Sequence, residues 1–467
     1  MEFNKENYTV ETLKLGEESL TFRAYRTLTY VEKPVCEEYQ RMNIFAPEVY
    51  YRGESINGYS LHTAPVFMPN TVGGYKPGPL AEPGFWGEGE KAVWNTIARA
   101  LLHGYVVAVP AIRGRSLQDE AGKYIGKAPA CIVDYKAAVR YLRHFAKALP
   151  GDMEKIITNG TSAGGALSSL MGSTGNHPDY EPYLRELGAA EESDAIFAAS
   201  CYCPIINMEN ADTAYEWQFN GVYEYHRSRM VMDEAGRPYF EPVDGQMTEA
   251  QVKVSKELMV MFPPYVNSLM LSDDTGNELT LASDGEGSFK EYVKSIVLDS
   301  ANKAIAKGLD LSGKSWLIIE NDKAVNMDWE GYARDITRLK NAPSFDDLTL
   351  RSGENDLFGS TEGQCRHFTE YALKNSLVNG AMADLKEVKM LNPMCYVEDE
   401  QAVKAKHFRI RHGECDRDTS LAISAMFVLK LREAGIEADY HAPWNVPHAG
   451  DYDLDELFAW IDGLVRE

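Results

Sequence analysis

A serine framed by glycines is the part of this chain with the clearest chemical meaning. Residues 160–165 read Gly-Thr-Ser-Ala-Gly-Gly, a G-x-S-x-G motif centred on Ser162. Apolar, strand-type residues 155–158 precede it, and helix-forming residues 166–171 follow it. A G-x-S-x-G turn between a strand and a helix lifts a serine hydroxyl clear of a sheet, and the tight turn requires small neighbours. We therefore predict that Ser162 is the nucleophile of an acyl transfer; the alternative is a serine in an ordinary glycine-rich turn.

Two histidines near the C-terminus are candidates for the general base that this serine needs. In α/β-hydrolases the order along the chain is serine, acid, histidine, and the histidine follows the last strand. His441 lies within the last predicted strand, residues 436–441, whereas His448 lies in the loop after it. We choose His448; the alternative is that it is a surface loop histidine.

The acid is expected in the loop after the preceding strand, which covers residues 408–413. That loop contains Asp416 and Asp418, and both can orient a histidine. Asp416 is the default because it lies nearer to the strand end. The alternative is that this is an ordinary acidic loop.

An oxyanion hole requires two N–H donors. The first is expected to be the backbone N–H of Ala163, directly after the nucleophile. The second should come from the loop that follows an early core strand, residues 64–69, and there Gly73 and Gly74 resemble the glycine-rich oxyanion loop of esterases. We choose Gly74; the alternative is a simple turn.

Strand-type and helix-type segments alternate over the first 200 residues, as in a sheet with crossover helices. They include a strand pair over 20–30, strands at 40–45, 64–69, 104–109 and 195–202, and a helix over 132–142. Residues from about 204 to about 393 are helical and loop-like, with few strand candidates. We predict an α/β-hydrolase core with a mainly parallel sheet, formed by residues 1–203 and 394–467. Residues 204–393 are predicted to form a large, mostly helical inserted cap (lid) domain.

Composition and charge narrow the range of partners. The 467 residues carry a net charge of −23, which argues against binding to nucleic acid or to an anionic membrane. No apolar run approaches the ~18 residues of a membrane helix, and the N-terminus lacks a signal-peptide core, so we expect a soluble, cytoplasmic protein. The seven cysteines are odd in number and scattered, which favours reduced thiols. We interpret Cys201 and Cys203 as strand core and not as metal ligands, and we expect no metal and no other cofactor.

With these residues assembled, the chain resembles the bacterial tannases (tannin acyl hydrolases) over nearly its whole length. The matching stretches are residues 69–75, 156–165, 214–221, 409–413 and 447–453. The resemblance implies a catalytic triad of Ser162, Asp416 and His448. It also implies that Lys340, Glu354 and Asp418 hold the hydroxyls of a galloyl ring.

The bacterial type is the better match because of one missing cysteine. Fungal tannases and the related feruloyl esterases clamp the acid and the histidine with a disulfide between the two preceding cysteines. Here Cys415 precedes Asp416, but Pro447 precedes His448. The clamp is therefore absent.

A galloyl group carries three adjacent phenolic hydroxyls, so two carboxylates can accept hydrogen bonds from them and an ammonium can donate one. Without the resemblance, Lys340 and Glu354 would be interpreted as surface charges. We expect a serine esterase that releases gallic acid from a small aromatic ester, with an esterase for protocatechuoyl or feruloyl groups as the nearest rival. A peptidase of the prolyl-oligopeptidase type would carry an N-terminal domain of β repeats, and none is visible. A non-catalytic binding module would be expected to lack one of the three triad candidates.

Overall fold

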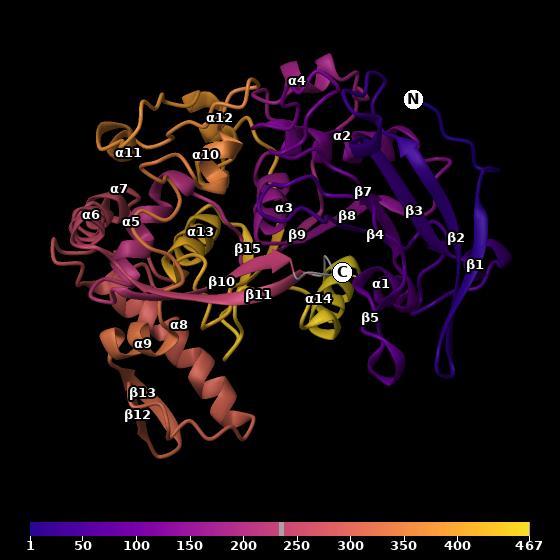
Figure 1. Ribbon diagram of the computed structural model, residues 1–467. Coiled ribbons are helices and arrows are strands. Elements are labelled where there is room, and N and C mark those ends of the chain that lie inside the picture. Colours follow the sequence, from indigo (N-terminus) through magenta and orange to yellow (C-terminus); the bar gives the residue numbers. More distant parts are fainter. Residues whose placement is uncertain (233–237, 467) are drawn as a thin grey trace.

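A nine-stranded sheet forms the centre of the molecule (Figure 1). The computed structural model describes residues 1–232 and 238–466. The strand order is β1-β2-β3-β7-β4-β8-β9-β14-β15. In that order the strands are Thr9–Leu15, Glu18–Thr29, Arg41–Pro47, Val106–Pro110, Pro65–Pro69, Asp152–Thr161, Ala198–Tyr202, His407–Arg411 and Glu437–His441.

The sheet is mainly parallel. The six strands from β7 to β15 pair in parallel, while β1, β2, β3 and β7 pair antiparallel at one edge. The predicted α/β fold with a mainly parallel sheet is confirmed. The strand pair predicted over residues 20–30 is wrong, because these residues form the single strand β2, which pairs with β1. Thr27, with φ 55°, and the register shift beside it mark an irregularity within the strand and not a turn.

Helices cover both faces of the parallel strands. Figure 1 shows α1 (Thr96–His103) and α14 (Leu454–Arg466) below the sheet, and α2 (Ala130–His144) and α3 (Ala163–Ser173) above it. Phe458 of α14 packs edge-on against Phe67 of β4, with ring centroids 5.9 Å apart. All residues of β4 and β7 are buried, as expected for parallel strands covered on both sides.

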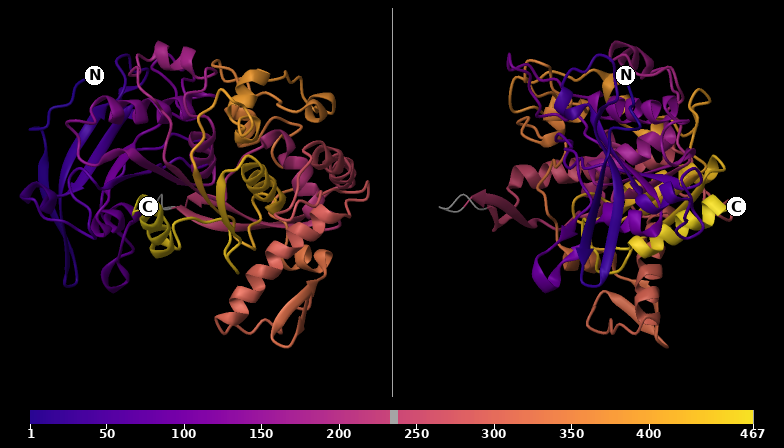
Figure 2. Two further views of the ribbon diagram at one scale, coloured as in Figure 1. Left: turned by 180° about the vertical axis from the view of Figure 1, so that it is seen from behind. Right: turned by 90° about the vertical axis from the view of Figure 1, so that its right-hand side faces the viewer.

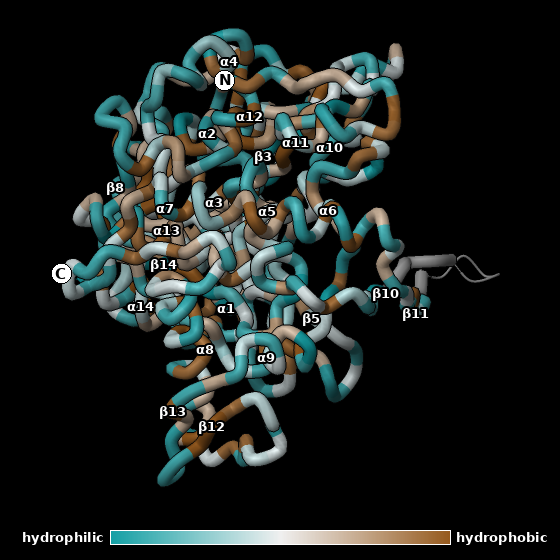
Figure 3. The backbone as a smooth tube through the Cα atoms, turned by 90° about the vertical axis from the view of Figure 1, so that its left-hand side faces the viewer, coloured by the Kyte–Doolittle hydropathy of each residue, from teal (hydrophilic) through white to brown (hydrophobic). Residues whose placement is uncertain are grey.

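The helix α13 (Leu421–Glu433) is buried along most of its length. A helix that is apolar on all sides belongs to the interior of a protein. Figure 3 shows hydrophilic segments along many outer loops, and hydrophobic segments both in the body of the molecule and in the outlying strand β12.

The segment between β9 and β14 contributes no strand to the central sheet. Its helices are α5 (Met208–Gln218), α6 (Glu249–Met259), α7 (Phe262–Ser268), α8 (Ser288–Ala306), α9 (Trp329–Ile336), α10 (Gly353–Leu357), α11 (Glu370–Lys374) and α12 (Leu385–Met390). The prediction from sequence missed two hairpins here, β10 (Glu224–Met232) with β11 (Pro238–Gln246), and β12 (Leu317–Glu320) with β13 (Lys323–Met327). Figure 2 shows both hairpins extending away from the sheet. The apolar run in β12, Leu317–Ile319, is only three residues long.

The remaining elements are short. They are β5 (Phe85–Trp86), β6 (Val93–Trp94), α4 (Glu181–Glu186), and the 3-10 helices Glu37–Tyr39, Glu48–Arg52, Gly89–Lys91 and Pro393–Cys395. None of the helices in the described part of the chain combines the length and the apolar character needed to cross a bilayer.

A fully buried ion pair anchors the end of α9 to α5. Arg338 Nη2 lies 2.6 Å from Glu216 Oε1, and both side chains have no exposed surface. Ser255 Oγ also donates to Glu216, and Arg338 Nε donates to the carbonyl of Lys340 at 2.6 Å. The pair is therefore well satisfied, and it sets the position of the backbone at Lys340.

Removal of one partner should show how much the Glu216–Arg338 pair contributes to the stability of the protein. We expect Arg338→Met to lower the free energy of unfolding by about 3–5 kcal/mol, because it leaves the Glu216 charge buried without a counter-charge. Urea denaturation measures the change. Arg334→Met is the control: Arg334 pairs with Glu330 on the surface, so the cost should stay within about 1 kcal/mol. A loss for Arg338→Met no larger than that of the control would contradict the anchoring role.

Candidate active site

Ser162 lies at a strained turn between β8 and α3. Its backbone has φ 62° and ψ −121°, in a region that non-glycine residues rarely adopt. A Cβ on Gly160 would lie 2.3 Å from the carbonyl oxygen of Gly164, and one on Gly164 would lie 2.5 Å from Asn70 Oδ1. The glycines of the motif are therefore required by close backbone approach, as the elbow motif predicts.

The two triad partners predicted from sequence lie in contact. His448 Nδ1 donates to Asp416 Oδ2 at 2.7 Å. Asp416, in the loop after β14, is completely buried, and His448, in the loop after β15, is partly exposed. Burial alone would raise the pKa of Asp416, but the charges of His448 and His412 hold it below its ordinary value. Burial alone would lower the pKa of His448, but the attraction of Asp416 outweighs burial and raises it.

The alternatives left open by the sequence have different surroundings. His441 lies in β15, and its Nδ1 is 2.7 Å from Lys303 Nζ, away from both aspartates. Asp418 does not contact His448; its carbonyl accepts a hydrogen bond of 2.8 Å from Lys340 Nζ, which is also 3.4 Å from its Oδ1. The Asp418 N–H donates to Asp416 Oδ1 at 2.7 Å. The two aspartates therefore lie in one loop, with Asp416 in contact with His448 and Asp418 in contact with Lys340.

A small pocket of about 110 Å³ brings most of the predicted residues together. Its lining includes six of the residues singled out from sequence and three further side chains: Ser162, Ala163, Gly74, Lys340, Glu354, Asp418, Tyr75, Ile205 and Phe345. Ala163 is the first residue of α3, so its N–H is at the helix N-terminus that faces the serine. Gly74 has φ 54°, in the left-handed region that favours glycine.

The pocket lining includes charges of both signs. Lys340 Nζ lies 4.3 Å from the centre of the Phe345 ring. Glu354 lies on α10 and is partly buried. Burial raises the pKa of Glu354, although the charge of Lys340 opposes the rise. Lys340 and Glu354 are therefore not isolated surface charges.

Tyr215 supports the position of Lys340 and was not singled out as a site residue from the sequence. The Tyr215 hydroxyl accepts hydrogen bonds from the N–H groups of Leu339 and Lys340, at 3.1 and 3.2 Å, and donates to the carbonyl of Arg417 at 2.9 Å. Tyr215 thus joins the lysine to the loop of the two aspartates. The only signal in the sequence was its place in residues 214–221, which resemble tannases.

Arg115 connects the loop of Gly74 to α10. Its Nε donates to the carbonyl of Gly74 at 2.8 Å, and its Nη1 lies 2.5 Å from Asp356 Oδ2, two residues after Glu354. Nothing in the sequence around Arg115 points to this role, because its partners lie about 40 and about 240 residues away.

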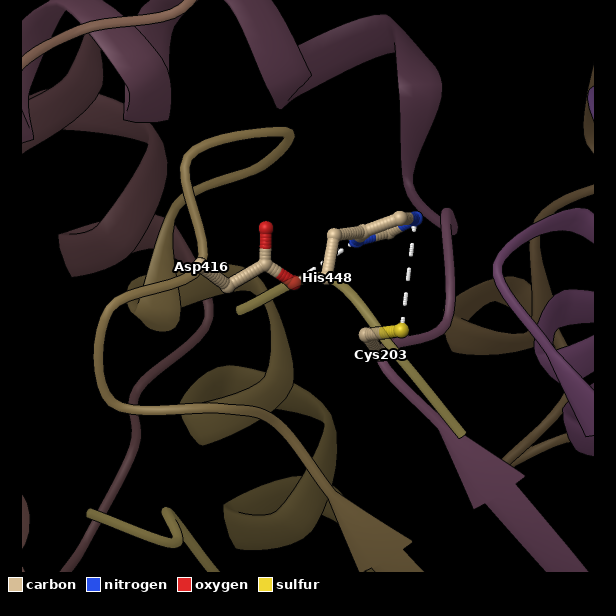
Figure 4. A group of neighbouring side chains, drawn as sticks. All are labelled: Cys203, Asp416 and His448. Atoms are coloured by element: carbon tan, nitrogen blue, oxygen red, sulfur yellow. Dashed lines mark hydrogen bonds and ion pairs between the residues drawn. The ribbon is translucent and has the colours of Figure 1, made fainter. Parts of the chain in front are cut away.

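Cys203 lies directly against the catalytic candidates (Figure 4). Its Sγ is 3.9 Å from His448 Nε2 and donates to the carbonyl of Ala449 at 3.4 Å. The interpretation of Cys201 and Cys203 as strand core is correct for Cys201, in β9. Cys203 is a buried core residue as well, but it lies directly after the strand end and its thiol faces the histidine. All seven cysteines are free thiols, as predicted.

Comparisons with known proteins agree on one family. The chain is 46% identical to a tannase from Fusobacterium nucleatum, with 99% of each chain covered and a TM-score of 0.93. It is 43% identical to a tannase from Lactobacillus plantarum, with 99% of this chain and 98% of that chain covered and a TM-score of 0.95. A tannin acyl hydrolase solved in complex with ethyl gallate is 42% identical over the same shares, with a TM-score of 0.92.

Two further comparisons are less informative. A family model described as BD-FAE matches residues 84–227, a range that contains Ser162. No curated protein matches the chain.

The pairing of His448 with Asp416 yields a direct test of the predicted catalytic residues. Ser162→Ala and His448→Ala should each lower kcat for ester hydrolysis on the order of 10⁴-fold or more, because nucleophile and base act as a unit. His441→Ala is the matched control, and it should retain activity within a few-fold because its ring contacts Lys303. Initial rates and circular dichroism of the purified variants provide the measurement. Activity that survives in His448→Ala and is lost in His441→Ala would assign the base to His441.

Proposed function

This chain belongs to the tannase (tannin acyl hydrolase) family, and on that premise we propose that it hydrolyses galloyl esters to gallic acid through an acyl-enzyme on Ser162. The observation that carries the proposal is the pocket described above, because the nucleophile and the charged acyl-binding candidates line one small cavity. A general serine esterase has no need of a lysine and two carboxylates beside its nucleophile.

In the first half of the reaction, the Ser162 hydroxyl attacks the ester carbonyl while His448 Nε2 takes its proton. The hydroxyl makes no hydrogen bond to another described residue, so it is free to turn toward the imidazole; such catalytic hydrogen bonds often tighten only around a substrate. Asp416 holds the ring so that Nδ1 carries a proton and Nε2 has a free lone pair. The N–H groups of Ala163 and Gly74 stabilise the oxyanion.

The protonated His448 then gives its proton to the leaving alcohol, the C–O bond of the ester breaks, and the galloyl group remains on Ser162 as the acyl-enzyme. In the second half, a water molecule attacks this acyl-enzyme while His448 Nε2 takes a proton from it. The tetrahedral oxyanion forms again at the same two N–H groups. Its collapse releases gallic acid, and His448 returns the proton to the Ser162 oxygen.

The acyl pocket is proposed to select the phenolic hydroxyls. Glu354 and Asp418 accept hydrogen bonds from them, and Lys340 donates to a phenolic oxygen. Lys340 and Glu354 lie in the segment 204–393, which we propose to be the cap that completes the pocket. An acyl group without hydroxyls would leave these charges unpaired, and a site of this kind rejects such analogues strongly.

Protocatechuoyl esters are the second candidate substrates. A related tannin acyl hydrolase has been solved in complex with 3,4-dihydroxybenzoate, an acid with two of the three hydroxyls. Feruloyl esters fit less well, because a methoxy group cannot donate a hydrogen bond to a carboxylate.

The two aspartates should separate by phenotype. Asp416→Asn should lower kcat on every ester by orders of magnitude, because the orientation of His448 serves all substrates alike. Asp418→Asn should mainly lower kcat/KM for methyl gallate relative to methyl benzoate, because it removes an acceptor for the acyl hydroxyls. Steady-state kinetics with both esters measures the difference. Equal loss on both esters in the two variants would show that this division of roles is wrong.

Selectivity for the galloyl group should depend on Glu354 and Lys340. Wild type should prefer methyl gallate to methyl benzoate, and Glu354→Gln or Lys340→Met should each reduce that preference by about one to two decades, since a hydrogen bond to a charged group contributes about 1.5–3 kcal/mol. The exposed Glu370 and Lys374 on α11 supply matched controls, Glu370→Gln and Lys374→Met, which should keep full selectivity.

The same selectivity should depend on pH. Burial raises the pKa of Glu354, so its carboxylate accepts hydrogen bonds only above that raised value and is protonated as the pH falls through it. The ratio of kcat/KM for gallate to that for benzoate should therefore fall on acidification, beginning above the ordinary pH range of glutamate. Effects on the shared triad cancel in this ratio. A ratio that falls identically in Glu354→Gln would remove Glu354 from the acyl pocket.

A further inference from the structure

The Cys203 thiol and the His448 imidazole face each other across a short gap. Cys203 is completely buried directly after β9, and its Sγ lies 3.9 Å from His448 Nε2 (Figure 4). This nitrogen is on the opposite edge of the ring from Asp416. The proposed reaction uses Nε2 as its base and gives no role to the thiol.

The separation of sulfur and nitrogen suits two ligands of one metal ion. Zinc lies about 2.3 Å from a cysteine sulfur and about 2.0–2.1 Å from a histidine nitrogen. These lengths span the observed 3.9 Å with an S–metal–N angle of about 127°, a moderately widened tetrahedral angle. Small movements of either side chain bring the angle closer to the ideal value.

The surroundings of His448 match those of a metal-binding histidine. Such histidines usually donate their other ring N–H to a carboxylate, which fixes the tautomer and makes the ligating nitrogen more basic. His448 Nδ1 donates to the fully buried Asp416 at 2.7 Å. Among the described residues, Cys203, Asp416 and His448 form the one group of three ligand-type side chains with such close spacing.

The donor set determines which cations fit. A thiolate sulfur and an imidazole nitrogen favour soft or borderline cations such as Cd²⁺ and Zn²⁺, whereas Mg²⁺ and Ca²⁺ prefer oxygen ligands. The other described cysteines have no place in such a group. Cys415 is the informative comparison, because it precedes Asp416 in the chain and is partly exposed.

We propose that Cys203 Sγ and His448 Nε2 together bind one thiophilic divalent cation, and that the bound cation switches ester hydrolysis off. The cation replaces the thiol proton, which goes to solvent, and accepts the Nε2 lone pair; no oxidation or reduction takes place. That lone pair is then no longer available to take the Ser162 proton. The inhibitory half of the proposal rests on the proposed role of His448, whereas the binding half does not.

Cadmium provides the test of binding, through the ultraviolet thiolate-to-cadmium charge-transfer band and isothermal titration calorimetry. Wild type should bind one Cd²⁺ per chain at this site. Cys203→Ser should remove the band and weaken binding at least about 10-fold, whereas the matched control Cys415→Ser should leave both unchanged. Asp416→Asn, which removes the carboxylate behind the ring, should weaken binding by about 10–100-fold while the band persists. Cys203→Ala is the second variant should Cys203→Ser fold poorly.

Inhibition is measured with 4-nitrophenyl acetate, because galloyl hydroxyls themselves chelate cations. Cys203→Ser should retain the uninhibited rate within a few-fold and require at least about 10-fold more Cd²⁺ for half inhibition than wild type or Cys415→Ser. An unchanged half-inhibiting concentration would overturn the switch, and an unchanged band in the cysteine variants would overturn the site.

Ser162→Ala separates this proposal from the proposed function. It should bind Cd²⁺ as wild type does, although it is inactive. If Ser162→Ala remained active, the proposed nucleophile would be wrong while the binding result would still stand on its own.

Discussion

The parallel pairing of β4, β8, β9, β14 and β15 is the constraint on which the rest of this structure depends. Parallel strands end at the same edge of a sheet, and the loops that follow them meet there. Gly74, Ser162, Cys203, Asp416 and His448 each follow the end of one of these five strands. Residues up to about 370 positions apart in the sequence are therefore brought to the same edge of the sheet.

A second constraint is the cost of burying charge. Asp416 is completely enclosed, and a carboxylate in that position requires a partner that holds a positive charge or donates hydrogen bonds. His448 supplies both, and the Asp418 N–H supplies a further hydrogen bond to Asp416. The same physical requirement that stabilises the fold thus orients the imidazole. It also leaves Nε2 on the other side of the ring, 3.9 Å from Cys203 Sγ.

Polar side-chain contacts join the segment between β9 and β14 to the rest of the chain. The Tyr215 hydroxyl donates to the carbonyl of Arg417, and Arg115 links Asp356 of α10 to the carbonyl of Gly74. Within the segment, the Glu216–Arg338 pair and the Tyr215 hydroxyl fix the backbone of Lys340. Through these links two residues of the pocket lining, Lys340 and Gly74, are connected by hydrogen bonds and ion pairs to neighbouring elements.

Much of the fold and of the candidate site followed from local patterns. The elbow around Ser162 was recognisable because a tight turn between strand and helix admits only glycine where backbones approach within about 3 Å. This restriction affects a few adjacent residues, so it can be recognised in the local sequence. The α/β core followed from apolar runs such as Val106–Pro110, and the order serine, acid, histidine limited the triad partners to two short loops. The two hairpins between β9 and β14 were missed, because each pairs only with itself and neither belongs to the central sheet whose long apolar strands the sequence revealed.

The sequence by itself therefore determined the nucleophile motif, the α/β core and, through resemblance, the candidate acyl-binding residues. Only the tertiary structure decided that His448, and not His441, contacts Asp416, that Asp418 faces Lys340, and that Tyr215, Arg115 and Cys203 adjoin the site. Local residue patterns reflect the needs of a turn, a strand or a helix. The contact between Cys203 and His448 joins residues that are 245 positions apart. No local sequence pattern indicates it, because it arises from the way that separate strands pair in one sheet.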